Sequence, residues 1–265
     1  MGTHTEPAVF HPKAAHMGLP GIRRVGFEQP FQWLRAGARD MARVWSLSLF
    51  YGVVFALLGY GLVHGARDKP HLAMALISGF LFVAPVLATV FYSLSHRLEQ
   101  NLKPHNLLAP LLSWRANPAA FGLFAVMLVF VLISWERLSA ILVGLFLGGS
   151  GIGGLAELLS LRALQQHTEF MLAYLAFGGV LALMMFSLSV VSLPMMLHRE
   201  VDFATALVTS FMATRHNFPV LLLWGVLIAG LTAVGVATNF IAMAVIFPWL
   251  GHASWHAYRG LIEHE

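Results

Sequence analysis

Long apolar stretches alternate with short basic stretches along the chain from about residue 31 onward. Each apolar stretch is close to the roughly 20 residues that a helix needs to cross the hydrocarbon layer, at about 1.5 Å per residue. The pattern predicts an all-α fold: a polytopic membrane helix bundle with six transmembrane helices. The predicted spans are residues 44–63, 72–94, 119–135, 170–193, 218–236 and 240–255.

The fifth and sixth predicted spans are separated only by Ala237, Thr238 and Asn239. One uninterrupted helix through both spans would be about 57 Å long, nearly twice the thickness of the hydrocarbon layer. Gly and Asn tolerate the backbone dihedral angles of tight turns. We therefore expect an antiparallel turn at residues 235–239.

The spans form three similar hairpins, at about residues 33–97, 106–199 and 206–259. Each copy begins with a short stretch that combines an apolar face with basic side chains, and each carries a proline in its second span. These prolines are Pro85, Pro194 and Pro248. Short basic helices with aromatic anchors lie in the plane of the membrane interface. We expect three pseudo-repeated hairpins with short interfacial helices before them.

The second hairpin contains an insertion at residues 138–166, expected on the non-cytoplasmic side. Residues 138–149 are apolar but too few to cross a bilayer, so we expect a re-entrant or interfacial segment there. The glycine-rich stretch that follows has the spacing of a dinucleotide-binding loop, but no strand precedes it, so a turn is expected. Glu136 and Arg137 then lie at the far interface. If the third helix continued to Gly148, this pair would lie within the membrane and be a functional candidate.

Composition supports the membrane assignment. Hydrophobic residues make up 58% of the chain and charged residues only 11%, whereas a soluble domain carries about 25% charged residues. The absence of cysteine excludes disulfides, thiolate metal sites and thiol catalysis. Residues 1–30 lack the apolar core of a signal peptide. We expect them to form a flexible cytoplasmic tail before a transmembrane domain at residues 31–265.

The distribution of positive charge predicts the orientation. Twelve of the 16 Lys and Arg residues lie before the first span, in the loops after the second and fourth spans, or after the sixth. Positive residues concentrate on the cytoplasmic side, so both termini are expected in the cytoplasm. Membrane lipid is the expected partner of this basic face. A nucleic-acid partner is not expected, because no basic domain lies apart from the membrane.

The second helix of each hairpin ends in a group of basic, acidic and aromatic residues. Cations at a helix C-terminus complement the helix dipole and also suit the cytoplasmic face, which is a sufficient structural explanation. The alternative is a binding site in which the three helix ends gather around a pseudo-threefold mouth. The residues of this candidate site are His96, Arg97, Glu99, His198, Arg199, Asp202, Trp255, Tyr258 and Arg259.

His252 and His256 are the candidate metal ligands. They are four residues apart and therefore share one face of the last helix, and paired imidazoles at this spacing can bind a metal ion or haem. A third ligand would come from His96, His198 or Glu99. The alternative is an interfacial belt in which the two histidines and the neighbouring aromatic residues anchor the helix at headgroup level.

Several segments carry a resemblance to a known family: FSLSVVSLPM (186–195), EVDFATA (200–206), LGHASWHAYR (250–259), SLSLFYG (46–52) and FVAP (82–85). Over about residues 30–260 the chain resembles a family of uncharacterised bacterial integral membrane proteins, a domain of unknown function. Some members are labelled as like cytochrome c oxidase subunit I. The resemblance implies a Gram-negative inner-membrane protein and supplies no catalytic residue. The chain is far shorter than an oxidase subunit I, so no oxidase activity is expected.

Three functions agree with the sequence. Because the sequence contains no catalytic constellation, we expect no enzymatic activity. The first hypothesis is an accessory or assembly subunit of a membrane complex, such as a respiratory complex, with a membrane-protein partner. The second hypothesis is a transporter or channel for a small or lipid-like solute. The third is a haem- or metal-handling protein centred on His252 and His256. The sequence does not identify a cofactor.

Overall fold

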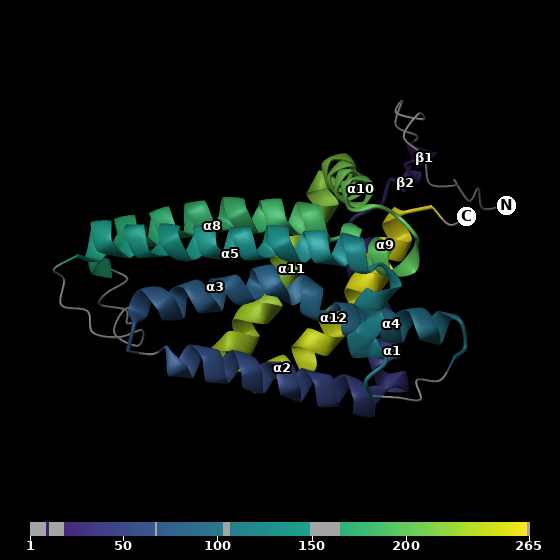
Figure 1. The fold of residues 1–265 in the computed structure, drawn as a ribbon, viewed down its shortest axis with the longest axis horizontal. Helices are drawn as coiled ribbons and strands as arrows, with labels where there is room; N and C mark the ends of the chain where they lie inside the picture. Colours follow the sequence, from purple (N-terminus) through teal and green to yellow (C-terminus); the bar gives the residue numbers. More distant parts are fainter. Residues whose placement is uncertain (1–8, 11–18, 67, 103–106, 149–164, 264–265) are drawn as a thin grey trace.

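The computed structural model describes residues 9–10, 19–66, 68–102, 107–148 and 165–263. Within these residues the chain is an all-α bundle with one two-residue antiparallel ladder (Figure 1). The elements are β1 (Val9–Phe10), β2 (Ile22–Arg23), α1 (Gln29–Arg43), α2 (Trp45–Gly65), α3 (Pro70–Leu87), α4 (Thr89–Glu99), η2 (Pro110–Ala116), α5 (Pro118–Leu147), α8 (Thr168–Ser189), α9 (Ser192–His198), α10 (Phe203–His216), α11 (Phe218–Ala237) and α12 (Met243–Leu261).

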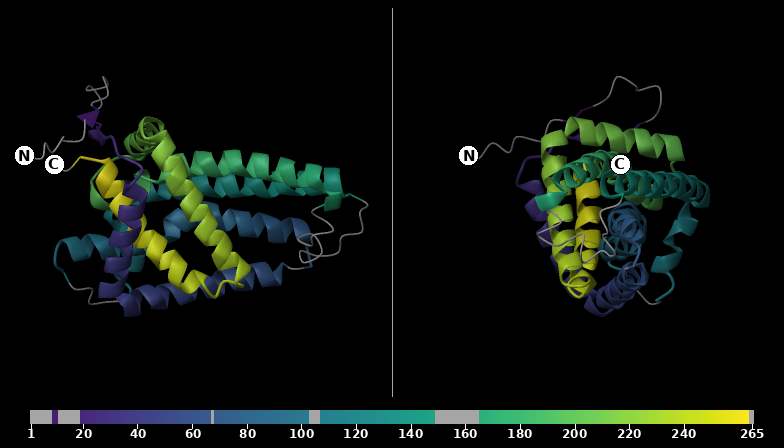
Figure 2. Two further views of the ribbon diagram at one scale, coloured as in Figure 1. Left: turned by 180° about the vertical axis from the view of Figure 1, so that it is seen from behind. Right: turned by 90° about the vertical axis from the view of Figure 1, so that its left-hand side faces the viewer.

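Four long helices, α2, α3, α5 and α8, lie roughly along the long axis of the bundle (Figure 1). The α11–α12 pair crosses this group obliquely, and α12 packs against α1, α2 and α4 (Figure 2). Helices α1 and α10 run across one end of the bundle, where β2 and the C-terminal end of α12 also lie (Figure 2), so this is the end that the sequence analysis assigns to both termini. Their assignment to the cytoplasm stays a prediction.

Five helical stretches of the described chain are long and apolar enough to cross a membrane. They overlap the first five predicted spans, and the prediction of an all-α membrane bundle is confirmed. The stretches are Trp45–Gly65, His71–Glu99, Pro118–Leu147, Thr168–His198 and Phe218–Ala237. The sixth predicted span is also helical, as α12, but α12 is not among these five. The count of six spans therefore stays a prediction.

The order of elements follows the predicted arrangement of three hairpins. A short helix (α1, η2 or α10) precedes each hairpin. The helix ends near its proline in two hairpins: α3 gives way to α4 soon after Pro85, and α8 to α9 shortly before Pro194. Proline lacks an N–H and its ring crowds the preceding turn, which explains the break before Pro194; the break after Pro85 lies beyond the turn that this proline crowds. Helix α12 nevertheless continues through Pro248. Equivalence of the three copies stays a prediction.

The third helix is longer than predicted. Helix α5 runs without a break to Leu147, so residues 138–147 continue it instead of forming a separate re-entrant or interfacial segment. The continuation has partners: Ser139 Oγ lies 3.2 Å from the hydroxyl of Tyr174 on α8. Such contacts allow the helix to extend alongside α8. Residues 149–164, which contain the predicted glycine-rich turn, lie outside the described residues.

The extension places Glu136 and Arg137 inside a helix rather than at its end. Their position along the bundle follows from Ser139, whose hydroxyl donates to the carbonyl of His71 (3.4 Å) at the start of α3. The pair is therefore level with the connection between α2 and α3, at the end of the bundle opposite α1 and α10. The two side chains lie 3.3 Å apart, with that of Arg137 77% exposed. This geometry agrees with an interfacial position.

The connection between α11 and α12 is the predicted tight turn. The N–H of Asn239 donates to the carbonyl of Val236, and the N–H of Phe240 donates to that of Gly235, both at 2.9 Å. These two bonds form a Schellman motif, with left-handed backbone at Asn239 (φ 50°). Phe240 also has positive φ (66°). Because the turn includes Phe240, the last helix begins at Met243 and not at residue 240.

Residues 19–28 differ from the predicted flexible tail. Ile22 is 1% exposed and forms a bridge with Ile262, just after α12. The side chain of Asn217, between α10 and α11, accepts a hydrogen bond from the N–H of Val25 (3.0 Å). An apolar side chain and backbone donors in this segment thus find partners in the bundle. Most of the remaining predicted tail lies outside the described residues.

Helix α1 lies directly against α12 because Gly37 has no side chain. A Cβ atom at this position would lie 2.5 Å from the backbone N of Ala253 and 2.8 Å from its Cα. Asp40 follows Gly37 by about one turn and is also buried on this side of α1. The close contact between the helices therefore carries a carboxylate into the bundle.

Candidate functional site

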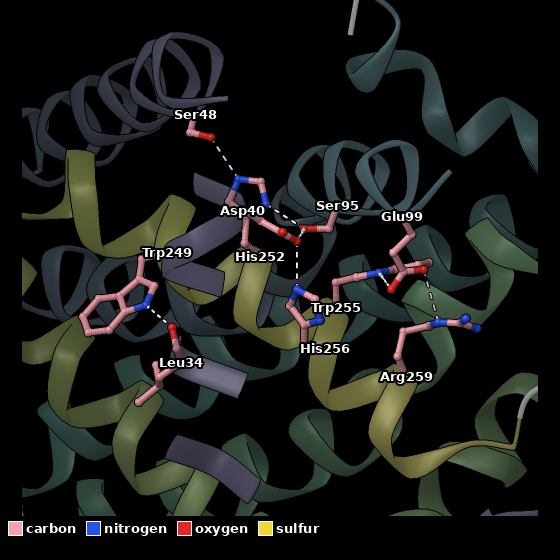
Figure 3. Close-up of polar contacts among 10 residues, drawn as sticks. All are labelled: Leu34, Asp40, Ser48, Ser95, Glu99, Trp249, His252, Trp255, His256 and Arg259. Carbon is pink, nitrogen blue, oxygen red and sulfur yellow. Dashed lines mark hydrogen bonds and ion pairs between the residues drawn. The ribbon is translucent and has the colours of Figure 1, made fainter. Parts of the chain in front are cut away.

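Four helices contribute to a buried set of hydrogen bonds, the Asp40 network (Figure 3). It consists of Asp40 on α1, Ser48 on α2, Ser95 on α4, and His252 and His256 on α12. The Ser48 hydroxyl lies 2.9 Å from Nε2 of His252, and the Ser95 hydroxyl lies 2.8 Å from its Nδ1. Oδ2 of Asp40 lies 2.8 Å from both the Ser95 hydroxyl and Nε2 of His256. The network thus joins α1, α2 and α4 to α12.

The direction of these hydrogen bonds follows from the chemistry of the groups. An ionised carboxylate only accepts, so Ser95 donates its single proton to Asp40. The Ser95 oxygen then accepts from Nδ1–H of His252, which leaves Nε2 of that ring to accept from Ser48. His252 is completely buried and both of its ring nitrogens have partners. We infer a neutral imidazole with its proton on Nδ1.

The Asp40 carboxylate is favoured in its charged form. Burial by itself would raise the pKa of this group, because the charge loses contact with water. The hydrogen bonds from His256 and Ser95 outweigh burial and hold the pKa of Asp40 below its ordinary value of 3.8. Asp40 lies on α1, outside the candidate membrane spans. The network therefore contains a fixed negative charge at the end of the bundle.

A second group, the basic–aromatic cluster, lies beside this network (Figure 3). It consists of His96, Glu99, His198, Trp255, Tyr258 and Arg259. The ring centroids of His96 and His198 are 5.0 Å apart, and Trp255 lies 5.2 Å from the first ring and 5.6 Å from the second. The Tyr258 hydroxyl lies 2.9 Å from Nδ1 of His198. Three helix ends, of α4, α9 and α12, meet here, although the candidate site was predicted from positions far apart in the sequence.

Glu99 is the carboxylate of the cluster. It accepts a hydrogen bond from the indole N–H of Trp255 (3.0 Å), and its other oxygen lies 3.3 Å from Nε of Arg259. The Arg259 Nε is buried and makes no hydrogen bond, so the 3.3 Å contact is an ion pair only. Nδ1 of His96 is likewise buried without a hydrogen bond. Two polar nitrogen atoms of the cluster thus lack hydrogen-bond partners among the described residues.

The other predicted site residues lie at the edge of the cluster or apart from it. Arg97 follows His96 on α4 and is partly buried. Arg199 donates to the backbone carbonyl of Glu263 (2.5 Å). Asp202 instead caps α10: its carboxylate accepts from the N–H and the hydroxyl of Thr205 at 2.9 and 2.6 Å. The fold thus brings most of the predicted residues together, whereas Asp202 caps a helix apart from them. That the cluster binds a ligand stays a prediction.

His252 and His256 have hydrogen-bond partners in place of the predicted third metal ligand. Among the residues that the structure describes, no group of three or more His, Asp or Glu side chains is arranged to hold a metal ion. Both nitrogens of His252 contact serine hydroxyls, and His256 contacts Asp40. The two histidines lie on one face of α12, as their spacing predicted, and this face makes hydrogen bonds to α1, α2 and α4.

The sequence did not predict an apolar pocket of about 370 Å³ between α3, α4, α8, α11 and α12. Its walls include Pro85, Phe186 and Gly225, and it is partly open to the surface of the bundle. Leu183 on α8 and Leu222 and Val226 on α11 line it and are 37%, 44% and 60% exposed, so the mouth lies between these two helices. Glycines and alanines along the walls leave room for the pocket. The sequence did not reveal it, because small residues in membrane helices also indicate close packing between helices.

Two hydroxyl groups mark one end of the apolar pocket. Tyr92 on α4 and Ser254 on α12 both line it. Ser254 donates to the carbonyl of Leu250 (2.8 Å). These hydroxyls supply the pocket with polar atoms on the side nearest the basic–aromatic cluster.

Comparison with known families agrees with the membrane assignment. A family model described as "Predicted integral membrane protein (DUF2189)", a family of unknown function, matches residues 73–198. The match confirms the resemblance for the part of the chain from α3 to α9. Searches of curated proteins and of solved structures each found no match. The chain is an integral membrane protein with several membrane-spanning helices.

Proposed function

We propose that this integral membrane protein is a non-enzymatic transporter or carrier of a lipid-like solute, which binds in the apolar pocket. The pocket is the observation that carries the proposal. Its volume of about 370 Å³ falls in the range of roughly 300–1,000 Å³ that small-molecule sites occupy. Its lining is almost entirely apolar, so the fitting ligand is a hydrocarbon chain rather than a polar solute.

The position of the mouth supports entry from the bilayer. Leu183, Leu222 and Val226 are exposed apolar residues on α8 and α11, and both helices belong to the candidate membrane spans. A pocket that opens between two spans faces hydrocarbon, where water does not compete for the space. A solute dissolved in the bilayer would therefore reach the pocket sideways, without passing through water.

Pro85 supports a moving wall. This proline lines the pocket in the last turn of α3, and a new helix, α4, begins at Thr89. Proline cannot donate to the carbonyl four residues earlier, so the backbone at Leu81 loses a helical hydrogen bond. A helix broken at the wall of a pocket can change its direction at lower cost than a continuous one. Carriers need such a change to release their solute.

The proposal selects the second of the three functions that agree with the sequence. The haem or metal role is less favoured, because no group of three or more His, Asp or Glu side chains among the described residues could hold an ion. The accessory role in a membrane complex stays a prediction. We propose the inner membrane as the location, with the basic end of the bundle and both termini in the cytoplasm. Membrane lipid is the proposed partner, without nucleic acid.

Photolabelling in nanodiscs tests the proposal. The probe is a phosphatidylcholine with a diazirine on one acyl chain, and labelled peptides are mapped by mass spectrometry. We expect labels on the pocket-facing parts of α8 and α11. Gly225→Leu should fill part of the pocket, because its Cβ would lie 3.9 Å from Phe186 on the opposite wall. We expect pocket labelling to fall about tenfold, which corresponds to a loss of about 1.4 kcal/mol in the free energy of lipid binding.

Gly230→Leu is the matched control. Gly230 lies on the same helix, does not line the pocket, and has open space where a Cβ would be added. It should leave pocket labelling unchanged. Labels spread evenly over the outer surface of the bundle, and equal in both variants, would refute the proposed function.

A further inference from the structure

The apolar pocket and the basic–aromatic cluster are neighbours along the same helix faces. Tyr92 lines the pocket, and His96 follows it by four residues on α4; Ser254 lines the pocket, and Tyr258 follows it by four residues on α12. Residues four apart lie on one face of a helix, about 6 Å from each other. The polar end of the pocket is therefore one helical turn from the cluster on two of its walls.

The cluster has the chemistry of an anion site. Glu99 is the one carboxylate of the cluster, and it contacts Trp255 and Arg259. The rings of His96 and His198 lie against each other and against Trp255. Arg97 and Arg199 add positive charge at the adjoining ends of α4 and α9. Guanidinium and imidazole groups are strong donors to phosphate and carboxylate oxygens.

Two nitrogens of the cluster lack a hydrogen-bond acceptor. Nδ1 of His96 and Nε of Arg259 are buried and make no hydrogen bond to the described residues, although Nε lies 3.3 Å from a Glu99 oxygen, with which a bound anion would share it. Buried polar atoms without partners are rare and costly. The cluster also reaches water: the side chain of Arg259 is 25% exposed and that of Glu99 31% exposed, while Trp255 and Tyr258 form a buried floor.

Resting on the proposed function, we infer that the pocket and the cluster together form one site for an anionic amphiphile. Its hydrocarbon chain lies in the apolar pocket, and its oxyanion group, a phosphate or a carboxylate, binds His96 and Arg259. The solute is then an acidic lipid or a lipid-like acid, and a zwitterionic or neutral lipid is a poorer ligand. Tyr92 and Ser254 lie at the junction between the two parts.

Competition between headgroups tests this inference. Phosphatidylglycerol and phosphatidylcholine, each with the same diazirine-bearing chain, are compared in nanodiscs of otherwise identical composition. Both headgroups contain a phosphodiester, but in phosphatidylcholine the choline cation neutralises it, so this lipid has no net attraction to the basic cluster. We expect the wild type to be labelled in the pocket about tenfold more by phosphatidylglycerol, which corresponds to about 1.4 kcal/mol. Arg259→Gln should reduce the preference to near one and leave phosphatidylcholine labelling intact.

Two further variants make the result specific. His96→Gln removes the second proposed contact and should also reduce the preference, so the test does not depend on Arg259→Gln folding. Arg215→Gln makes the same charge change on α10, at an exposed position outside the cluster, and should keep the full preference. Phosphatidylcholine labelling of the pocket confirms in each case that the variant is folded.

The outcomes separate this inference from the proposed function. Pocket labelling that is equal for the two lipids, or a preference that survives both Arg259→Gln and His96→Gln, overturns the headgroup site and leaves the proposed function standing. No pocket labelling by either lipid overturns the proposed function itself. Inorganic phosphate is the third probe, and its binding to the wild type is measured by calorimetry. If phosphate binds but the protein shows no preference between the two lipids, the cluster is a site for free anions only, and the inference of an anionic amphiphile is overturned.

Discussion

Replacing Asp40 with alanine tests whether the Asp40 network holds α1 against the bundle. The carboxylate has hydrogen-bond partners in Ser95 and His256, both at 2.8 Å. A hydrogen bond to a charged group contributes about 1.5–3 kcal/mol, and a buried donor that loses its acceptor carries a penalty. Relief of the cost of burying the carboxylate offsets part of this loss. We expect Asp40→Ala to lower the free energy of unfolding by about 3 kcal/mol.

Asp40→Asn separates the charge from the shape of the side chain. Ser95 and His256 both contact Oδ2 of Asp40. The single carbonyl oxygen of asparagine can take this place and accept from both, but it carries no full negative charge. We expect a loss of about 1.5 kcal/mol, between alanine and wild type. Glu200→Gln is the control: it removes an exposed carboxylate and should change stability by less than about 0.5 kcal/mol.

The assay is unfolding of the purified protein by SDS in mixed micelles, followed by tryptophan fluorescence. Trp33 is a suitable reporter, because it lies on α1, is 3% exposed, and packs edge-on against Trp224 (ring centroids 5.7 Å apart). Detachment of α1 would expose it. If Asp40→Ala unfolds at the same SDS fraction as Glu200→Gln, apolar packing alone holds α1 and the reasoning about the network is wrong.

The same carboxylate gives stability a pH dependence of known sign. The folded pKa of Asp40 lies below its ordinary value of 3.8, so the unfolded chain takes up this proton first as the pH falls. The contribution of Asp40 is complete above about pH 5 and decreases as the pH falls below 3.8 toward the folded pKa. The stability difference between wild type and Asp40→Asn should therefore shrink over this range. A difference that grows toward low pH contradicts the argument.

Two further predictions concern the packing of α1 and of the N-terminal segment. Gly37→Ala should destabilise the protein by about 1–3 kcal/mol in the same SDS assay, because the added Cβ would lie 2.5 Å from the backbone of Ala253. Gly61→Ala is the control, since its Cβ would have nothing within 4 Å, and it should be neutral or slightly stabilising. Equal losses of stability in the two variants would contradict the close contact assigned to Gly37. Asn217→Ala should raise the amide exchange rate of Val25 about tenfold, by loss of a hydrogen bond at 3.0 Å, while exchange within α5 stays unchanged.

The helices themselves were predictable because membrane spans have a simple sequence signature. Length and apolar composition located five stretches that the structure also finds. The turn after α11 was predictable for the same reason, since a continuous helix would have exceeded the bilayer. The end of α5 was not. Glu136 and Arg137 resemble a helix end at an interface, but the helix continues because Ser139 and Tyr174 provide contacts with α8 that the sequence does not show.

The sequence predicted which residues belong to the candidate site but not which contacts they make. The repeated His and Arg residues at helix ends identified His96, His198 and Arg259, which the fold brings together. The partners of His252 were not foreseeable: Ser48 and Ser95 are separated from it by 204 and 157 residues. A spacing of four residues indicates a shared face of one helix, but it does not reveal which helix covers that face. The apolar pocket was missed for the same reason.

Helix α12 explains why hydropathy alone undercounts the elements that build the site. It packs against α1, α2, α4 and α11, and His252, Trp255 and Tyr258 on it are almost completely buried. A helix surrounded by protein can carry histidines, because polar groups in a bundle interior find partners that lipid cannot supply. One face of α12 then holds the Asp40 network while Leu250 and Ser254 on another line the pocket. Low hydropathy in α12 therefore follows from its central place in the bundle and does not show that it lies outside the membrane.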